Sequence, residues 1–148
     1  MSRNQDAPPA LGTRLTYLFK RALADLEDLY AEHLAPVGVT GRELGVLLLL
    51  DGEATSQQQV AGRFGVDRTT MVGLVDALEG KGLVARRRDA DDRRRNVLEL
   101  TAEGHAALAR AVRASDEAER QLLAGLDAEE SAQLRTLLAR LSRERPRL

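Results

Sequence analysis

Apolar positions recur at spacings of three and four along most of the chain, which is the period of amphipathic α-helices. The first such run extends from Ala10 to about His33 and predicts a helix roughly 36 Å long, which is long for a chain of 148 residues. A helix of this length with few loops around it usually spans two subunits or two lobes. The segment Ala35-Pro36-Val37-Gly38 is predicted to end it.

Capping patterns predict where the later helices begin. Three starts have Ser, Thr or Asp followed three residues later by Glu or Gln, which is typical of a capping box: Thr40 with Glu43, Ser56 with Gln59, and Asp127 with Glu130. Asp67 and Thr101 are further N-cap residues. The helix after Thr40 is apolar almost all round from Leu44 to Leu50, so we expect it to be buried.

The helical period stops after Gly80 and Gly82. Residues 83–88 and 96–100 are predicted to be short strands, with a polar turn at 89–93 between them. Within the second strand, alternation places Val97 and Glu99 on one face and Leu98 and Leu100 on the other. These segments together predict a β-hairpin.

The distribution of charge along the chain indicates what this hairpin binds. The net charge of the chain is −1, yet seven basic and three acidic residues lie between Lys81 and Arg95. Two short helices joined by Gly65-Val66 come directly before the hairpin. The order helix, turn, helix, basic hairpin predicts a mainly α (α+β) fold, a winged helix-turn-helix whose two-stranded wing covers residues 83–100. We expect its partner to be double-stranded DNA.

Candidate DNA contacts follow from this arrangement. The start of the second short helix is predicted to meet base edges in the major groove, and the hairpin arginines to reach the minor groove or phosphates. The candidates are Ser56, Gln57, Gln58, Arg68, Thr69, Thr70, Arg86, Arg93, Arg94 and Arg95. Capping and solvation are the alternative for the Ser56 segment and for the helix start at Arg68. For the arginines at 86–88 the alternative is pairing with Asp89, Asp91 and Asp92.

Several motifs resemble the MarR family of bacterial and archaeal transcription regulators. They are Asp89-Ala90-Asp91-Asp92-Arg93-Arg94, then Leu98-Glu99-Leu100-Thr101 with Gly104, and Leu78-Glu79-Gly80-Lys81-Gly82-Leu83-Val84. Ala90 departs from the proline that is common in the family. The resemblance implies that Arg94 enters the minor groove and that Asp92 stabilises the wing, by holding either the Arg94 side chain or the loop.

The same resemblance implies a homodimer and a domain organisation. It predicts a flexible tail at 1–9, a helical dimerisation region at 10–36 and 104–148, and a DNA-binding lobe at 37–103, all in one compact domain. It also implies a pocket for a small-molecule effector that relieves repression. Tyr17, Tyr30 and His33 are the candidate ligand residues, with packing in the core or interface as the alternative for the tyrosines.

Other classes of function find little support in the residues. The chain has no cysteine, and its two histidines, His33 and His105, have no histidine at ligand spacing, so we expect no metal and no cofactor. It lacks a glycine-rich phosphate loop and a nucleophile elbow, so we expect that the protein is not an enzyme. No apolar run is long enough for a membrane span, and we expect a soluble cytoplasmic protein. The alternative function is an architectural or protein-interaction winged-helix module.

Overall fold

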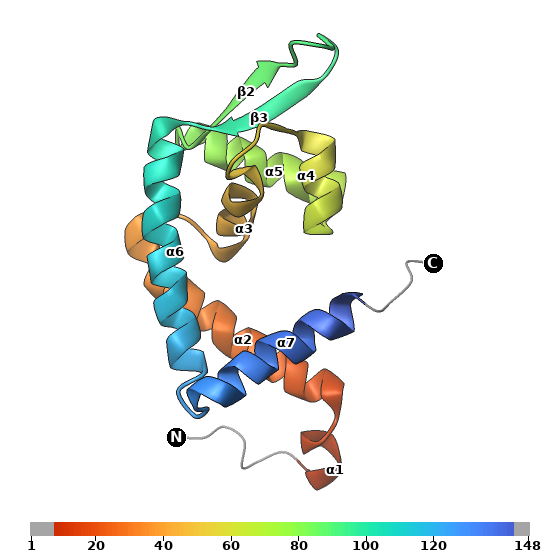
Figure 1. The fold of residues 1–148 in the computed structure, drawn as a ribbon, viewed down its shortest axis with the longest axis vertical. Helices are drawn as coiled ribbons and strands as arrows, with labels where there is room; N and C mark the ends of the chain where they lie inside the picture. The colour runs from red at the N-terminus through yellow and green to blue at the C-terminus, as the bar shows by residue number, and fades with distance from the viewer. Residues whose placement is uncertain (1–7, 144–148) are drawn as a thin grey trace. The chain divides into compact units, whose positions relative to one another are not determined.

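The structure is a computed structural model that describes residues 8–143. Helices make up most of it (Figure 1), and three short strands form an antiparallel sheet in the order β1-β3-β2. The elements are α1 (Pro9–Gly12), α2 (Leu15–Leu34), the 3-10 helix η1 (Ala35–Val37), α3 (Gly41–Leu50), β1 (Thr55–Ser56), α4 (Gln57–Phe64), α5 (Arg68–Gly80), β2 (Val84–Arg88), β3 (Asn96–Leu100), α6 (Ala102–Leu122) and α7 (Ala128–Arg143).

Contacts within the chain divide it into two compact units. One consists of Met1–Leu29 and Glu117–Leu148, and the other of Tyr30–Asp116. The second is larger than the predicted lobe at 37–103 because the end of α2 and the start of α6 belong to its core. Leu34 is fully buried there, as are Ala107 and Ala111.

The long helix predicted from Ala10 to His33 is interrupted near its start. Pro9 begins α1, and α2 begins only at Leu15. Gly12 and Thr13 are weak helix formers, and the Thr13 hydroxyl donates back to the carbonyl of Ala10 at 3.4 Å. Of the predicted tail at 1–9, residues 1–7 lie outside the part of the chain that the structure describes.

Helices of the Tyr30–Asp116 unit begin at the predicted N-cap residues. Thr40 and Glu43 form the expected capping box, with hydrogen bonds of 3.0 and 3.1 Å in the two directions. The helix that they begin, α3, is the central core helix, with Val46, Leu47 and Leu50 almost fully buried. The core thus forms around α3, as its uniformly apolar sequence predicts.

The hairpin forms as predicted, and a third strand joins it. β2 and β3 pair from Val84 opposite Leu100 to Arg88 opposite Asn96. The unpredicted strand β1 pairs with the other edge of β3. Adjacent residues of a strand lie on opposite faces, yet both Val97 and Leu98 are buried, because β3 is the central strand and α3 and α4 both contact it.

Two turns connect α5 to the hairpin and the hairpin to α6. After α5, Gly82 adopts a left-handed φ of 73°, and the amide of Leu83 donates to the carbonyl of Leu78 at 3.0 Å. This Schellman turn aims the chain into β2. At the far end, the Thr101 hydroxyl donates to the carbonyl of Gly82 at 2.6 Å and accepts from the amide of Gly104 at 3.0 Å. Thr101 therefore caps α6 and fastens it to the α5 turn.

No single helix within residues 8–143 is long and apolar enough to cross a membrane, and the stretch Leu15–Val37 with Gly41–Leu50 meets the criteria only as a sharply bent pair.

Candidate nucleic-acid interface

Asp67 holds the first turn of α5. Its carboxylate accepts hydrogen bonds from the amide of Thr70 at 2.7 Å and from the Thr70 hydroxyl at 3.0 Å. These bonds, the amide bond first, hold the pKa of Asp67 below its ordinary value of 3.8. The Thr70 hydroxyl is thus engaged as a donor within the cap, whereas Arg68 and Thr69 are exposed.

The two faces of α5 differ in their surroundings. Met71, Val75 and Leu78 are fully buried in the core. The opposite face begins at Thr69 and carries Gly73, where an added Cβ would meet no atom within 4 Å. The helix therefore offers an exposed, uncrowded face over its first two turns, as an element that enters a DNA groove requires.

The start of α4 contributes a second group of polar side chains. Ser56 is only 8% exposed, and its hydroxyl accepts from the amide of Gln59 at 3.2 Å while the Gln59 side chain accepts from the Ser56 amide. Ser56 also pairs with Val97 in the sheet. Its side chain is therefore used inside the fold, and the surface is presented by Gln57 and Gln58.

The turn of the wing is held by its aspartates. Asp92 accepts from the amide of Arg94 through its carboxylate and from the amide of Arg95 through its carbonyl, both at 3.0 Å. The Asp89 carboxylate accepts from the amide of Asp91 at 3.1 Å. Asp92 thus holds the loop backbone, and the structure shows no ion pair between it and the Arg94 side chain.

The wing arginines fall into two groups. Arg86 pairs with Asp76 at 2.5 Å and with Glu79 at 3.3 Å, both on α5, and Arg87 pairs with Glu99 at 3.0 Å. The aspartates of the turn, which the sequence suggested as partners, are not involved. The second group consists of exposed arginines with no ion pair among residues 8–143: Arg88, Arg93, Arg94 and Arg95.

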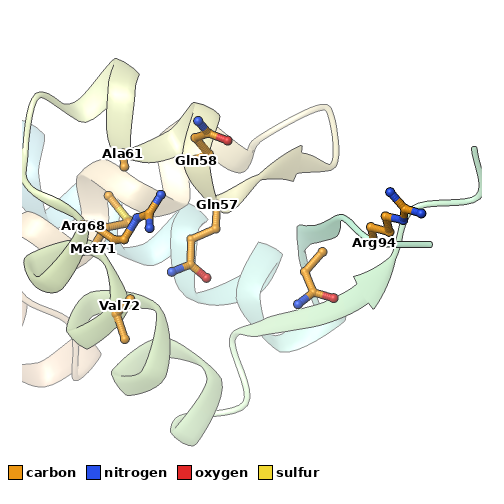
Figure 2. Close-up of a pocket in the computed structure, with 8 residues that line it drawn as sticks. Gln57, Gln58, Ala61, Arg68, Met71, Val72 and Arg94 are labelled. Carbon is orange, nitrogen blue, oxygen red and sulfur yellow. The ribbon is translucent and has the colours of Figure 1, made fainter. Parts of the chain in front are cut away.

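These elements surround one open cleft of about 550 Å³. Figure 2 shows Gln57, Arg68 and Val72 on the helical side of the cleft and Arg94 on the wing. Its lining residues are Gln57, Gln58, Ala61, Arg68, Met71, Val72, Arg94 and Asn96. Arg68 and Arg94, 26 positions apart in the sequence, have no ion pair among residues 8–143. Both line the same space and make it a positively charged site for a polyanion.

The structure brings some predicted residues together and adds others. Gln57, Gln58, Arg68 and Arg94 line the cleft, whereas Arg86 is bound to acids of α5. Sequence reasoning missed Val72, although a spacing of four residues from Arg68 placed it on the same side of the helix. It also missed Ala61 and Asn96, whose positions depend on how α4 and β3 pack.

The candidate ligand residues lie in different units. Tyr17 is half-buried in Met1–Leu29. Tyr30 and His33 belong to the other unit, where Tyr30 packs against the core and lies beside Gly41. The Nε2 atom of His33 is buried with no hydrogen-bond partner among the described residues. Within those residues no group of His, Asp and Glu side chains is arranged to hold a metal ion.

Comparison with known proteins agrees with this geometry. The model of the MarR family matches residues 37–95, which run from the end of η1 to the wing turn. A curated relative from Thauera aromatica, a putative transcriptional regulatory protein for the hcr operon, is 37% identical over 108 residues, or 72% of this chain. The match spans 65% of that relative's length.

Solved structures extend the similarity to both units. The transcriptional repressor CouR, bound to a 23-mer DNA duplex, is 36% identical with a TM-score of 0.85, over 91% of this chain and 96% of that one. CouR bound to p-coumaroyl-CoA is 33% identical with a TM-score of 0.83, over 95% of this chain and 100% of that one.

Proposed function

The chain belongs to the MarR family of winged-helix transcription regulators, and from this premise we propose that it is a repressor that binds an inverted-repeat operator as a homodimer and is released by a small-molecule effector. The observation that carries the proposal is the cleft between α5, α4 and the wing, where Arg68 and Arg94 face the same space and neither pairs with an acid in the part of the chain that the structure describes. Duplex DNA is the polyanion whose grooves suit a helix flanked by a hairpin.

Each part of the cleft has a distinct role in this proposal. The first turns of α5 enter the major groove, where Arg68 donates to base edges, best to the paired acceptors of guanine. Gln57 and Gln58 donate to phosphates beside the groove. Arg94 reaches the adjacent minor groove from the wing, where the electrostatic potential is most negative. Thr69 lies on the exposed face of α5 and Arg93 and Arg95 flank Arg94 on the turn, so they are secondary candidates.

Dimer formation is supported by the unit formed by Met1–Leu29 and Glu117–Leu148. Ala118 is the one fully buried apolar residue among its described positions. This unit instead exposes large apolar side chains on its helices and in the α6–α7 connection, and a chain rarely leaves so many uncovered. They are Leu11, Leu15, Leu18, Phe19, Leu23, Leu126, Leu134, Leu137, Leu138 and Leu141. We propose that a second copy covers them, which places two recognition helices about one DNA turn apart.

Effector binding is supported by the relative that is bound to p-coumaroyl-CoA. A ligand that binds a low-affinity state of the dimer better than the DNA-binding state lowers operator affinity by that difference. Tyr17, Tyr30 and His33 remain the candidate ligand residues. The buried Nε2 of His33 supports its inclusion, because a bound ligand would supply the hydrogen bond that the described residues do not.

The alternative, an architectural or protein-interaction module, predicts a different salt dependence. Binding to DNA through several phosphates falls steeply as salt rises, because counterions are released from the duplex. Binding to a protein through the same surface has a shallower dependence. The exposed arginines of the wing turn favour the first behaviour.

The test is selection of bound sequences from random duplexes, with sedimentation at micromolar concentration for the oligomeric state. We expect an inverted repeat with half-site centres roughly 10 base pairs apart and a dimer in solution. Arg94→Ala is expected to weaken operator binding by about 1–3 kcal/mol, or roughly 5- to 150-fold. Arg87→Ala is the matched control, because Arg87 lies on the same hairpin but pairs with Glu99. A folded Arg94→Ala variant with wild-type affinity, or a monomer, contradicts the proposal.

A further inference from the structure

We propose that Val72 reads the 5-methyl group of a thymine in each operator half-site, an inference that rests on the proposed DNA-binding function. Val72 is 37% exposed on α5 and lines the cleft (Figure 2). Apart from Val72, the large apolar residues of α5 are Met71, Leu74, Val75 and Leu78, and all of them are buried or half-buried. Val72 is therefore the large apolar residue that α5 keeps at its surface.

The fold itself gains little from a valine at this position. A β-branched residue in a helix loses rotamer freedom, and alanine, leucine, arginine, lysine and glutamate are all better helix formers. The side chain is exposed and is not among the residues packed against the hydrophobic core. Stability of the isolated chain therefore does not explain Val72, whereas an apolar partner in the cleft does.

The position of Val72 relative to Arg68 limits what that partner is. Residues four apart lie on the same side of a helix, about 6 Å from each other along its axis. That length is roughly two base-pair steps, because successive base pairs are about 3.4 Å apart. Val72 is thus expected to lie over the major-groove edge of a base pair close to the one that Arg68 contacts.

The methyl group of thymine is the bulky apolar group on the major-groove edges. An isopropyl group pressed against the hydrogen-bond donors and acceptors there leaves them without water or partners. Arg68, which lies beside Val72 in the cleft, is suited to the polar edges. The two side chains therefore contact different groups: Arg68 contacts a polar base edge, and Val72 contacts a methyl group.

The test replaces each thymine of the selected operator, one symmetric pair at a time, with deoxyuridine, which removes the methyl group and keeps the base pair. For wild type we expect one pair of positions at which affinity falls about fourfold per half-site, the effect of one buried methyl group. In Val72→Ala this loss is expected to disappear, and affinity for the unmodified operator is expected to fall by a similar factor.

Matched variants separate this contact from other effects. Val72→Thr keeps the branched shape and one methyl group, so part of the thymine preference is expected to remain. Leu48→Ala is the control, because Leu48 is also apolar and 50% exposed in the same unit but does not line the cleft. It is expected to leave both the affinity and the thymine preference unchanged. Circular dichroism of each variant checks that it is folded.

Two results overturn the inference. In the first, wild type shows no thymine position at which loss of the methyl group weakens binding. In the second, the sensitive position stays equally sensitive in Val72→Ala, so that Val72→Ala loses equal affinity for thymine and uracil operators, which assigns the contact to the sugar-phosphate backbone. In each of these the protein still binds DNA, so the proposed function stands. Absence of binding to any duplex refutes the proposed function and this inference together.

Discussion

Substitution of Gly104 tests how the wing is joined to the rest of its unit. A Cβ built on Gly104 would overlap the carbonyl oxygen of Leu83 and come within 3.0 Å of the Leu83 carbonyl carbon. That carbonyl is held in place because it accepts a hydrogen bond from the amide of Thr101 at 3.1 Å. Thr101 is also bonded to Gly82 and to the amide of Gly104 itself. The neighbour that an alanine meets is therefore backbone, which cannot move aside without breaking these bonds.

The expected cost of Gly104→Ala follows from these contacts. Overpacking of this kind costs about 1–3 kcal/mol, and backbone contacts belong at the upper end of the range. Alanine recovers about 0.5–1 kcal/mol of helix propensity in α6. We expect a net loss of roughly 2 kcal/mol in the free energy of unfolding, which lowers Tm by about 5 °C for a chain of this size.

Urea unfolding followed by circular dichroism measures this loss, with wild type and variant at the same protein concentration because dimerisation adds to stability. Gly73→Ala is the matched control. Gly73 is also helical but has nothing within 4 Å of its added Cβ. It is expected to raise the free energy of unfolding by about 0.5–1 kcal/mol. A Gly104→Ala variant as stable as wild type refutes the reasoning.

Three further predictions concern single side chains. The Cβ added by Gly73→Ala projects from the exposed face of α5, so operator affinity in a gel-shift assay is expected to fall while stability rises; unchanged affinity contradicts the placement of this face in the groove. Lys81 pairs at 2.8 Å with Glu43, which is 3% exposed, so Lys81→Met is expected to cost about 1–3 kcal/mol in urea unfolding. Adding Glu43→Gln should recover most of this loss, and a double variant no more stable than the single one contradicts an unpaired charge as its cause. The hydrogen bonds from Thr70 lower the pKa of Asp67, so its stabilisation is present above the unfolded-state pKa of 3.8 and is lost as pH falls through the lower folded pKa. Acid titrations of wild type and Asp67→Asn should therefore differ above pH 3.8 and converge below the folded pKa, and parallel curves throughout contradict this assignment.

Much of the local structure was predictable because it is set by residues that lie close to one another in the sequence. The capping boxes at Thr40, Ser56 and Asp127 each join residues three positions apart, and all three form. The strand Asn96–Leu100 has its predicted bounds, and its partner begins one residue later than expected, at Val84. The wing motif also indicated the family, which the comparisons confirm.

The predictions that differ from the structure concern features that depend on contacts between segments distant in the sequence. Strand β1 has two residues, too few for a periodic pattern, and exists because it pairs with β3. The partners of Arg86 are Asp76 and Glu79, which the packing of α5 against β2 brings within reach. Nearby aspartates on the turn were the obvious partners in the sequence, yet their oxygens hold the turn's backbone amides.

By itself, the sequence determined the starts of the capped helices, the hairpin and the excess of positive charge on it, because each depends on residues within a few positions of one another. Tertiary structure alone decided which arginines are bound to acids and which face the cleft, since that depends on how α4, α5 and the wing pack together. It also decided that Ser56 is buried while Val72 is exposed. Burial is a property of the assembled core, and a single residue's chemistry does not determine it.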